Sequence, residues 1–191
     1  MNKKEAKIIN IILLVTAIID AILLTRAIII GSKAIVDSVL VAVLLLVAYK
    51  YKANSNLNTA TVSGAAIFFV LHLFGAHGLY DYYIFDSIGY DKLLHFYGPF
   101  VLFVVVFNYL DFKKTKLTLK NIIIFAALIT LGINAIQEVL EFTGNSLLGK
   151  GEGVFFYGSG DLGGDDTPKD LIANFLGVTL SGIVMYFGKR K

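Results

Sequence analysis

Six long apolar stretches, separated by polar segments, constrain the fold of this chain more than any other feature of its sequence. They cover about residues 8–30, 35–50, 60–80, 91–110, 119–142 and 170–187. A transmembrane helix needs about 20 predominantly apolar residues, and these stretches reach or approach that length. Soluble domains are about 45–50% apolar, whereas this chain is 57% apolar. We therefore predict an all-α, polytopic membrane helix bundle that forms a single integral membrane domain over residues 1–191.

The first apolar stretch follows Lys3, Lys4 and Lys7, as the apolar region of a signal peptide also would. The apolar region of a signal peptide has roughly 7–15 residues and ends near a small-x-small cleavage site. This stretch is longer, and no convincing cleavage site follows it. We expect a retained first helix, in which Asp20 either makes an interhelical hydrogen bond or has a functional role.

Basic residues gather on one side of the predicted bundle. With six spans, that side receives the N-terminus, the segments near Lys50 and Lys113, and the C-terminal tail, which together hold twelve of the 17 lysines and arginines. Cytoplasmic loops of membrane proteins carry the excess of lysine and arginine. We predict that both termini are cytoplasmic, that the loop 143–169 lies outside, and that the protein resides in the cytoplasmic (inner) membrane.

Four of the predicted helices carry polar residues at their outer ends. These residues are His72 and His77 in the third helix, Asp91 and His95 in the fourth, Glu138 and Glu141 in the fifth, and Asp166, Asp170 and Asn174 in the sixth. Residues three or four positions apart share a helix face. Ionisable residues in membrane segments usually face the bundle interior and mark functional sites. We therefore predict one site at the outer end of the bundle.

Each of these residues also has a structural explanation. Asp166, which precedes Thr167 and Pro168, is typical of a helix N-cap, and Asp91 fits an interaction with the helix dipole. His72 and His77 are five positions apart and do not share a face, so we favour His72 as the residue that faces the site. A hydrogen bond between helices is the commoner role of any single member, but the group as a whole favours a site.

Carboxylates brought together in a low dielectric repel one another unless one is protonated or a cation is present. Zinc prefers a site rich in imidazole, whereas magnesium, manganese and calcium prefer carboxylates. The chain has no cysteine, which excludes thiolate sites, and motifs such as HExxH are absent. The candidate ligands of a divalent metal are His72, Asp91, His95, Glu138 and Asp170. The candidate catalytic residues are Glu138, Glu141 and His95, and the other site-lining residues are Asp166, Asn174 and His77.

A resemblance to known membrane proteins lies in four segments between about residues 70 and 177. They read LHLFGAH, YDKLLHFYGPF, NAIQEVLEF and GDLGGDDTPKDLIANFLG. In this pattern the chain resembles the YjdF-like family of uncharacterised inner-membrane proteins and, more loosely, the VanZ-like proteins. VanZ-like proteins have an Asp-x-x-x-His motif, an acidic motif in the fifth helix and an Asp-x-x-x-Asn-x-x-Gly motif in the same order. The resemblance implies a fold and a site rather than a particular reaction. The arginine that VanZ-like proteins tend to carry before the last motif has no match here.

Three functions remain open. The first is a metal-assisted hydrolase or transferase that acts on a lipid-linked or cell-envelope precursor. The second is an ion- or proton-coupled transporter that uses the same acids as a relay. The third is a non-catalytic membrane protein whose polar cluster holds helices together. The expected partner is the lipid bilayer, with no nucleic acid, and the sequence specifies neither the substrate nor the oligomeric state.

Overall fold

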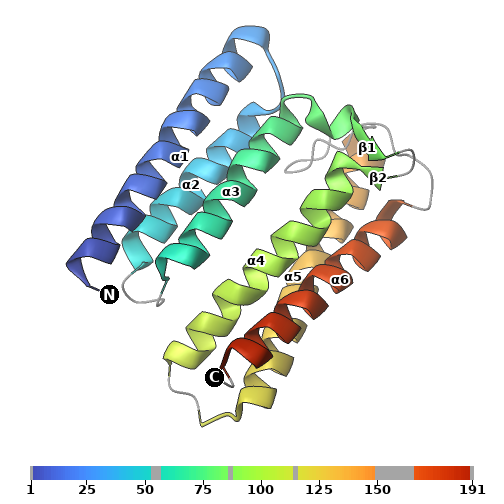
Figure 1. Cartoon of the computed structure of the whole chain (residues 1–191). Coiled ribbons are helices and arrows are strands. Elements are labelled where there is room, and N and C mark those ends of the chain that lie inside the picture. The colour runs from blue at the N-terminus through green and yellow to red at the C-terminus, as the bar shows by residue number, and fades with distance from the viewer. Residues whose placement is uncertain (1, 53–56, 86–87, 114–115, 149–165, 190–191) are drawn as a thin grey trace.

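The computed structural model describes residues 2–52, 57–85, 88–113, 116–148 and 166–189. Its helices are α1 (Lys3–Ile30), α2 (Ile35–Tyr51), α3 (Thr59–Ala76), α4 (Tyr90–Phe112), α5 (Leu119–Leu148) and α6 (Asp166–Lys189). A short 3-10 helix η1 (Leu79–Asp81) and an antiparallel hairpin of β1 (Tyr83–Phe85) and β2 (Ile88–Gly89) connect α3 to α4 (Figure 1). The predicted all-α, polytopic membrane bundle is confirmed.

Five of these helices, all except α2, are long and apolar enough to cross a membrane. The α2 helix has 17 residues, which is a length of about 25 Å at 1.5 Å per residue. The α1 and α3 helices run in the same direction through the bundle (Figure 1), so α2 returns the chain through the same thickness. The protein is therefore a multi-pass membrane protein.

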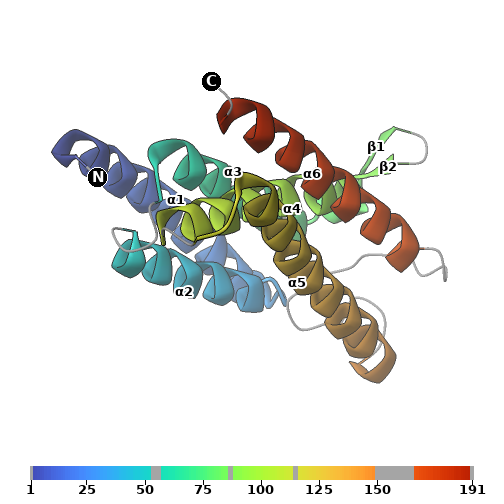
Figure 2. The same ribbon diagram turned by 90° about the horizontal axis from the view of Figure 1, so that it is seen from below.

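The helices form two groups of three. The α1 helix packs on α2 and α3, whereas α4 packs on α5 and α6 and also on α3, which joins the groups. The first turn of α1 and the last turn of α6 lie at the same end of the bundle, here called the termini end (Figure 1). The opposite end, which carries β1 and β2, is here called the hairpin end. The α4 helix lies at the centre of the arrangement (Figure 2).

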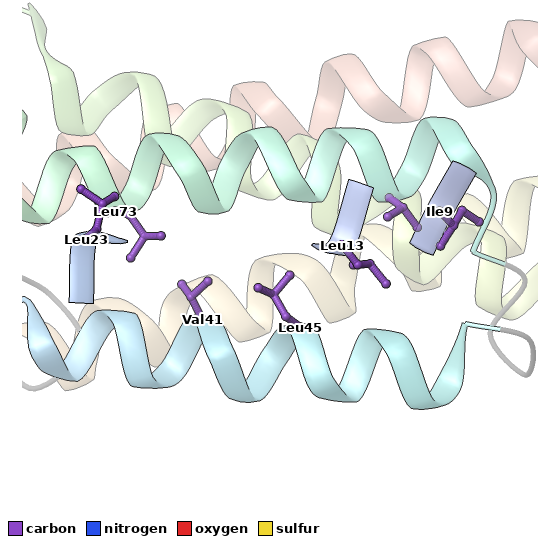
Figure 3. Packing of buried hydrophobic residues seen from close by; sticks show 7 residues of the cluster. Ile9, Leu13, Leu23, Val41, Leu45 and Leu73 are labelled. Carbon is purple, nitrogen blue, oxygen red and sulfur yellow. The ribbon is translucent and has the colours of Figure 1, made fainter. Parts of the chain in front are cut away.

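Each group has its own apolar core. The first core joins α1, α2 and α3 through Ile9, Leu13, Leu23, Val41, Leu45, Val62 and Leu73 (Figure 3). The second core joins α4, α5 and α6 through Phe103, Phe107, Ile122, Ala126 and Val178. Large apolar side chains also cover the outer surface; Ile29, for example, is 78% exposed. A surface of this kind suits contact with lipid rather than with water.

The helix ends differ from the predicted ends in several places. The α3 helix ends at Ala76, before the predicted residue 80, because Gly78 adopts φ 122°, a conformation that glycine tolerates and other residues rarely adopt. The hairpin between α3 and α4 was not predicted. The α5 helix continues to Leu148, beyond the predicted residue 142, and α6 begins at Asp166, before the predicted residue 170.

Candidate functional site

An imidazole and three carboxylates from α4, α5 and α6 meet at the hairpin end. His95 Nδ1 lies 3.2 Å from Glu138 Oε1, and His95 Nε2 lies 3.7 Å from Asp170 Oδ1. Glu138 and Asp170 are only 4% and 2% exposed. One possible ligand atom from each of His95, Glu138 and Glu141 lies within 4.8 Å of the other two. These three residues could therefore hold one metal ion.

A close approach of α4 and α6 brings Asp170 to His95. At Gly177 a Cβ atom would collide with the Phe96 carbonyl oxygen, so only glycine lets the two backbones come this near. Asp170 precedes Gly177 by seven residues, which is about two helical turns, and both therefore lie on the same face of α6. That face presents Asp170 to His95 on α4.

Lys92 adds a cation that the sequence analysis did not single out. Its Nζ atom lies 2.7 Å from Asp170 Oδ1 and 2.7 Å from Asp91 Oδ2. The charged groups of this part of the structure are the carboxylates of Asp91, Glu138, Glu141 and Asp170 and the side chains of Lys92 and His95. Among the residues that the structure describes, four carboxyl groups therefore lie near two basic side chains. A divalent cation would offset the repulsion among those carboxyl groups that are ionised.

The other predicted members have different positions. Asn174 is 1% exposed, and neither of its amide atoms has a hydrogen-bond partner among the described residues. The side chain of Asp166 lies outside the described part of the structure. His77 Nδ1 lies 2.7 Å from Arg26 Nη1. Burial and the positive charge of Arg26 lower the pKa of His77, and the carboxylate of Asp37 opposes them.

His72 belongs to a second polar cluster, built by α2, α3 and η1. Its Nε2 atom lies 3.0 Å from the buried Asp37 Oδ1, and its Nδ1 atom lies 2.6 Å from the Tyr80 hydroxyl. Because an ionised carboxylate only accepts, Nε2 carries a proton in this contact, and in the neutral ring Nδ1 then accepts from the phenol. With both ring nitrogens engaged, His72 could bind a metal only by giving up one of these contacts.

Tyr80 reaches His72 because the chain turns back after α3. Gly78 makes the turn at φ 122°, and the Tyr80 ring then packs over Gly75, where a Cβ would lie 2.6 Å from the ring. Burial first, and then the charge of Asp37, raises the pKa of Tyr80 well above its ordinary value. The phenol therefore keeps its proton and donates it in the hydrogen bond to His72.

Sequence reasoning missed Asp37, Tyr80 and Lys92. Asp37 had a usable signal, because it is a carboxylate in the first turn of an apolar helix and lies at the same end of the bundle as His72. The sequence also held a signal for Tyr80, because Gly78, two residues before it, can end the helix and let the chain turn. Lys92 follows Asp91 directly in the sequence, but only the packing of α6 reveals its contact with Asp170.

A cavity of about 750 Å³ connects the two polar clusters. This volume lies within the roughly 300–1,000 Å³ of small-molecule sites. At the hairpin end the cavity is lined by His72, Tyr80, Asp91, His95 and Glu141. Toward the termini end its lining includes Val41, Leu45, Val62, Ala65, Val101 and Val105. The cavity is therefore polar at one end and apolar along most of its length, as a site for an amphiphile would be.

Comparison with protein families matches residues 7–191 to the family described as "Predicted membrane protein (DUF2238)". No curated protein and no solved structure matches the chain. The family match covers nearly the whole chain and agrees with the membrane-spanning helices of the structure. The chain belongs to the DUF2238 family of predicted membrane proteins.

Proposed function

We propose that this protein is a divalent-metal-dependent membrane hydrolase or transferase that acts on a lipid-type or cell-envelope precursor. One observation carries the proposal. Possible ligand atoms of His95, Glu138 and Glu141 lie within 4.8 Å of one another, and His95 and Glu141 line the polar end of a large apolar cavity. Ligands and an amphiphile-shaped cavity at the same place are what catalysis on a lipid head group requires.

The donor set suits a divalent cation. One imidazole and two carboxylates supply three protein ligands, the number that catalytic zinc sites use, and the carboxylates also suit magnesium, manganese or calcium. The second ring nitrogen of His95 faces Asp170 at 3.7 Å. Carboxylates in this position orient ligating histidines and increase their basicity. A metal ion at this place would polarise a phosphoryl or acyl oxygen or lower the pKa of a bound water.

Residues around the metal site would supply the general base, the charge balance and the exclusion of water. Glu141 is half-buried and lines the cavity, so its carboxylate oxygen that does not bind the ion is best placed to accept a proton from an attacking water or hydroxyl. Lys92 partly neutralises Asp170 and keeps that carboxylate in position beside His95. Tyr80 stands on another part of the cavity wall, where its ring excludes water from the polar end.

The structural alternative has one specific observation in its favour. Lys92 bridges Asp91 of α4 and Asp170 of α6 at 2.7 Å each, so these charges also hold two helices together. The transport alternative gains less support. Ionisable side chains line the cavity mainly at the hairpin end, and the buried Asp20 lies apart from them in α1.

The proposal includes the placement of the protein. We infer a cytoplasmic membrane location with both termini in the cytoplasm, because the six-helix topology assigns twelve of the 17 basic residues to the side of the termini. The metal cluster at the hairpin end would then face outward, toward envelope precursors. We also propose that this chain is related to the YjdF-like and VanZ-like proteins.

Thermal unfolding in detergent tests the metal site. The protein is stripped with chelator and then given zinc, magnesium, manganese or calcium. A metal at 100 times its Kd stabilises the folded state by about 2.7 kcal/mol, or about 5–10 °C in a chain of this size. His95→Ala and Glu138→Ala should abolish the shift, while Asp111→Asn, at the other end of α4, should retain it. A shift that survives in His95→Ala and Glu138→Ala, or no shift in the wild type, would reject the proposal.

A further inference from the structure

We propose that the cavity binds a single hydrocarbon chain of a membrane amphiphile, with the polar head group at His95 and Glu141. The proposal assigns a substrate class to the site, and it rests on the proposed function for the chemistry at the head group. Binding of the chain itself depends on the apolar wall, which is formed by helices other than α6 and by none of the carboxylates.

The dimensions of the cavity select one chain. His95 and Val105 both line it, and ten residues of helix span about 15 Å at 1.5 Å per residue. One leaflet is half of a hydrocarbon core about 30 Å thick, so 15 Å is about the depth that one lipid chain occupies. The cavity volume of about 750 Å³ lies in the range of sites that hold one small ligand. One chain with a small head group is a ligand of that size.

The wall of the deep part suits a hydrocarbon. Val62, Ala65 and Val101 present apolar groups, and the polar side chain of Thr61 is already engaged. The Thr61 hydroxyl donates to Asn58 Oδ1 at 2.9 Å and accepts from Asn108 Nδ2 at 2.9 Å. A polar group beside Val62, Ala65 and Val101 would lose its hydration without finding partners, whereas a methylene chain would lose nothing.

The arrangement of the helices offers the chain a way in. The α2 helix packs mainly on α1, and the α5 helix packs on α4 and α6. Both line the cavity, and both lie on the same side of α3 and α4 (Figure 2). The proposal places the entry from the bilayer between α2 and α5, with any second chain of the same lipid outside.

Two alanines in the wall mark different depths. The contact between Asp37 and His72, at 3.0 Å, fixes a common level on α2 and α3. Ala65 is seven residues from His72, a distance of about 10 Å along the helix, and Ala48 is eleven residues from Asp37, about 16 Å. A phenylalanine at residue 65 would block the cavity near its middle, and a phenylalanine at residue 48 would block it about 6 Å deeper.

The test measures binding of monoacylglycerols with chains of 8, 12, 16 and 20 carbons to delipidated protein by native mass spectrometry. These probes have an uncharged head group, so their binding does not require a metal. In the wild type we expect one probe per protein, with affinity that rises up to 16 carbons and then stops rising. Each methylene that enters should increase affinity about fourfold, the equivalent of about 0.8 kcal/mol.

Ala65→Phe should weaken binding of the 16-carbon probe at least tenfold and leave the 8-carbon probe nearly unchanged. Ala48→Phe should shorten the preferred chain less than Ala65→Phe does, and it also serves if Ala65→Phe fails to fold. Ile67→Phe is the matched control, because Ile67 lies on α3, is 52% exposed and does not line the cavity. Glu138→Ala should lose metal binding and keep the chain preference, which separates this proposal from the metal site.

Several results would overturn the proposal. The first is an affinity that does not depend on chain length, and the second is two or more equivalent probes bound per protein. The third is an equal effect of Ala65→Phe and Ile67→Phe on probe affinity. Self-association of the protein that Ala65→Phe alone abolishes would also overturn it, because the cavity would then bind a second copy of the chain.

Discussion

Replacement of Lys92 by methionine tests how the charges at the hairpin end are balanced. Lys92→Met keeps an unbranched side chain of similar length but removes the cation that lies 2.7 Å from both Asp91 and Asp170. The two carboxylates should respond differently. The Asp91 side chain is 26% exposed and can be hydrated, whereas the Asp170 side chain is 2% exposed and cannot. The loss of stability should therefore come mainly from Asp170.

The expected magnitude follows from burial. Removing one partner of a buried ion pair costs about 3–5 kcal/mol, because the other charge stays buried. His95 Nε2 remains 3.7 Å from Asp170, so we expect the lower end of that range, about 3 kcal/mol. For a chain of this size, about 3 kcal/mol corresponds to a decrease in Tm of about 6–12 °C.

Thermal unfolding in detergent, with chelator present, measures the effect. Lys189→Met is the matched control, because Lys189 pairs with Asp111 at 2.6 Å while their side chains are 44% and 39% exposed. An exposed pair of this kind contributes at most about 1 kcal/mol. The double variant Lys92→Met/Asp170→Asn should recover part of the loss, since it removes the buried charge as well. Equal effects of Lys92→Met and Lys189→Met, or strict additivity in the double variant, would refute the reasoning.

Three further predictions follow from other parts of the structure. Gly177→Ala should lower stability by about 3 kcal/mol, because its methyl group meets backbone of α4 that cannot move aside, while Gly132→Ala, which meets nothing within 4 Å, should not destabilise. The free energy of unfolding should decrease as pH drops through about 6.5. Burial and a nearby arginine lower the pKa of His77, so the unfolded chain binds the proton first. If His77→Asn leaves the pH dependence of the free energy of unfolding unchanged, this prediction is wrong. Cysteines in Lys4→Cys and Tyr82→Cys should react with an impermeant reagent from opposite sides of the membrane, since the chain has no other cysteine, and labelling from the same side would reverse the topology.

The helices could be predicted because the apolar stretches are long and their boundaries are chemically distinct. Asn2 and Asn58 cap α1 and α3 by accepting hydrogen bonds from the backbone at 2.8 and 2.9 Å, and Gly31 ends α1 with φ 65°. The grouping of acids at helix ends could also be predicted from residue spacing alone. His95 and Glu138 are close because α4 begins and α5 ends at the same end of the bundle.

The choice of partners could not be predicted, because lipid-facing and protein-facing positions are both apolar in a membrane protein. Periodicity therefore does not say how each helix is rotated. The contact of His72 with Asp37 depends on the packing of α2 and α3, and that of Lys92 with Asp170 depends on the close approach of α4 and α6. Tyr80 joins His72 only because the chain reverses at a glycine, which no helical pattern reveals.

A crystal structure of the protein soaked in manganese, with anomalous diffraction recorded to locate the ion, tests the metal centre directly. Manganese is chosen because it accepts both imidazole and carboxylate ligands. We predict one strong anomalous peak about 2.0–2.4 Å from a nitrogen of His95 and from oxygens of Glu138 and Glu141, and no such peak in Glu138→Ala. A fully occupied manganese ion at another position, or no peak at this cluster at saturating manganese, would contradict the assignment of a metal centre to these three residues.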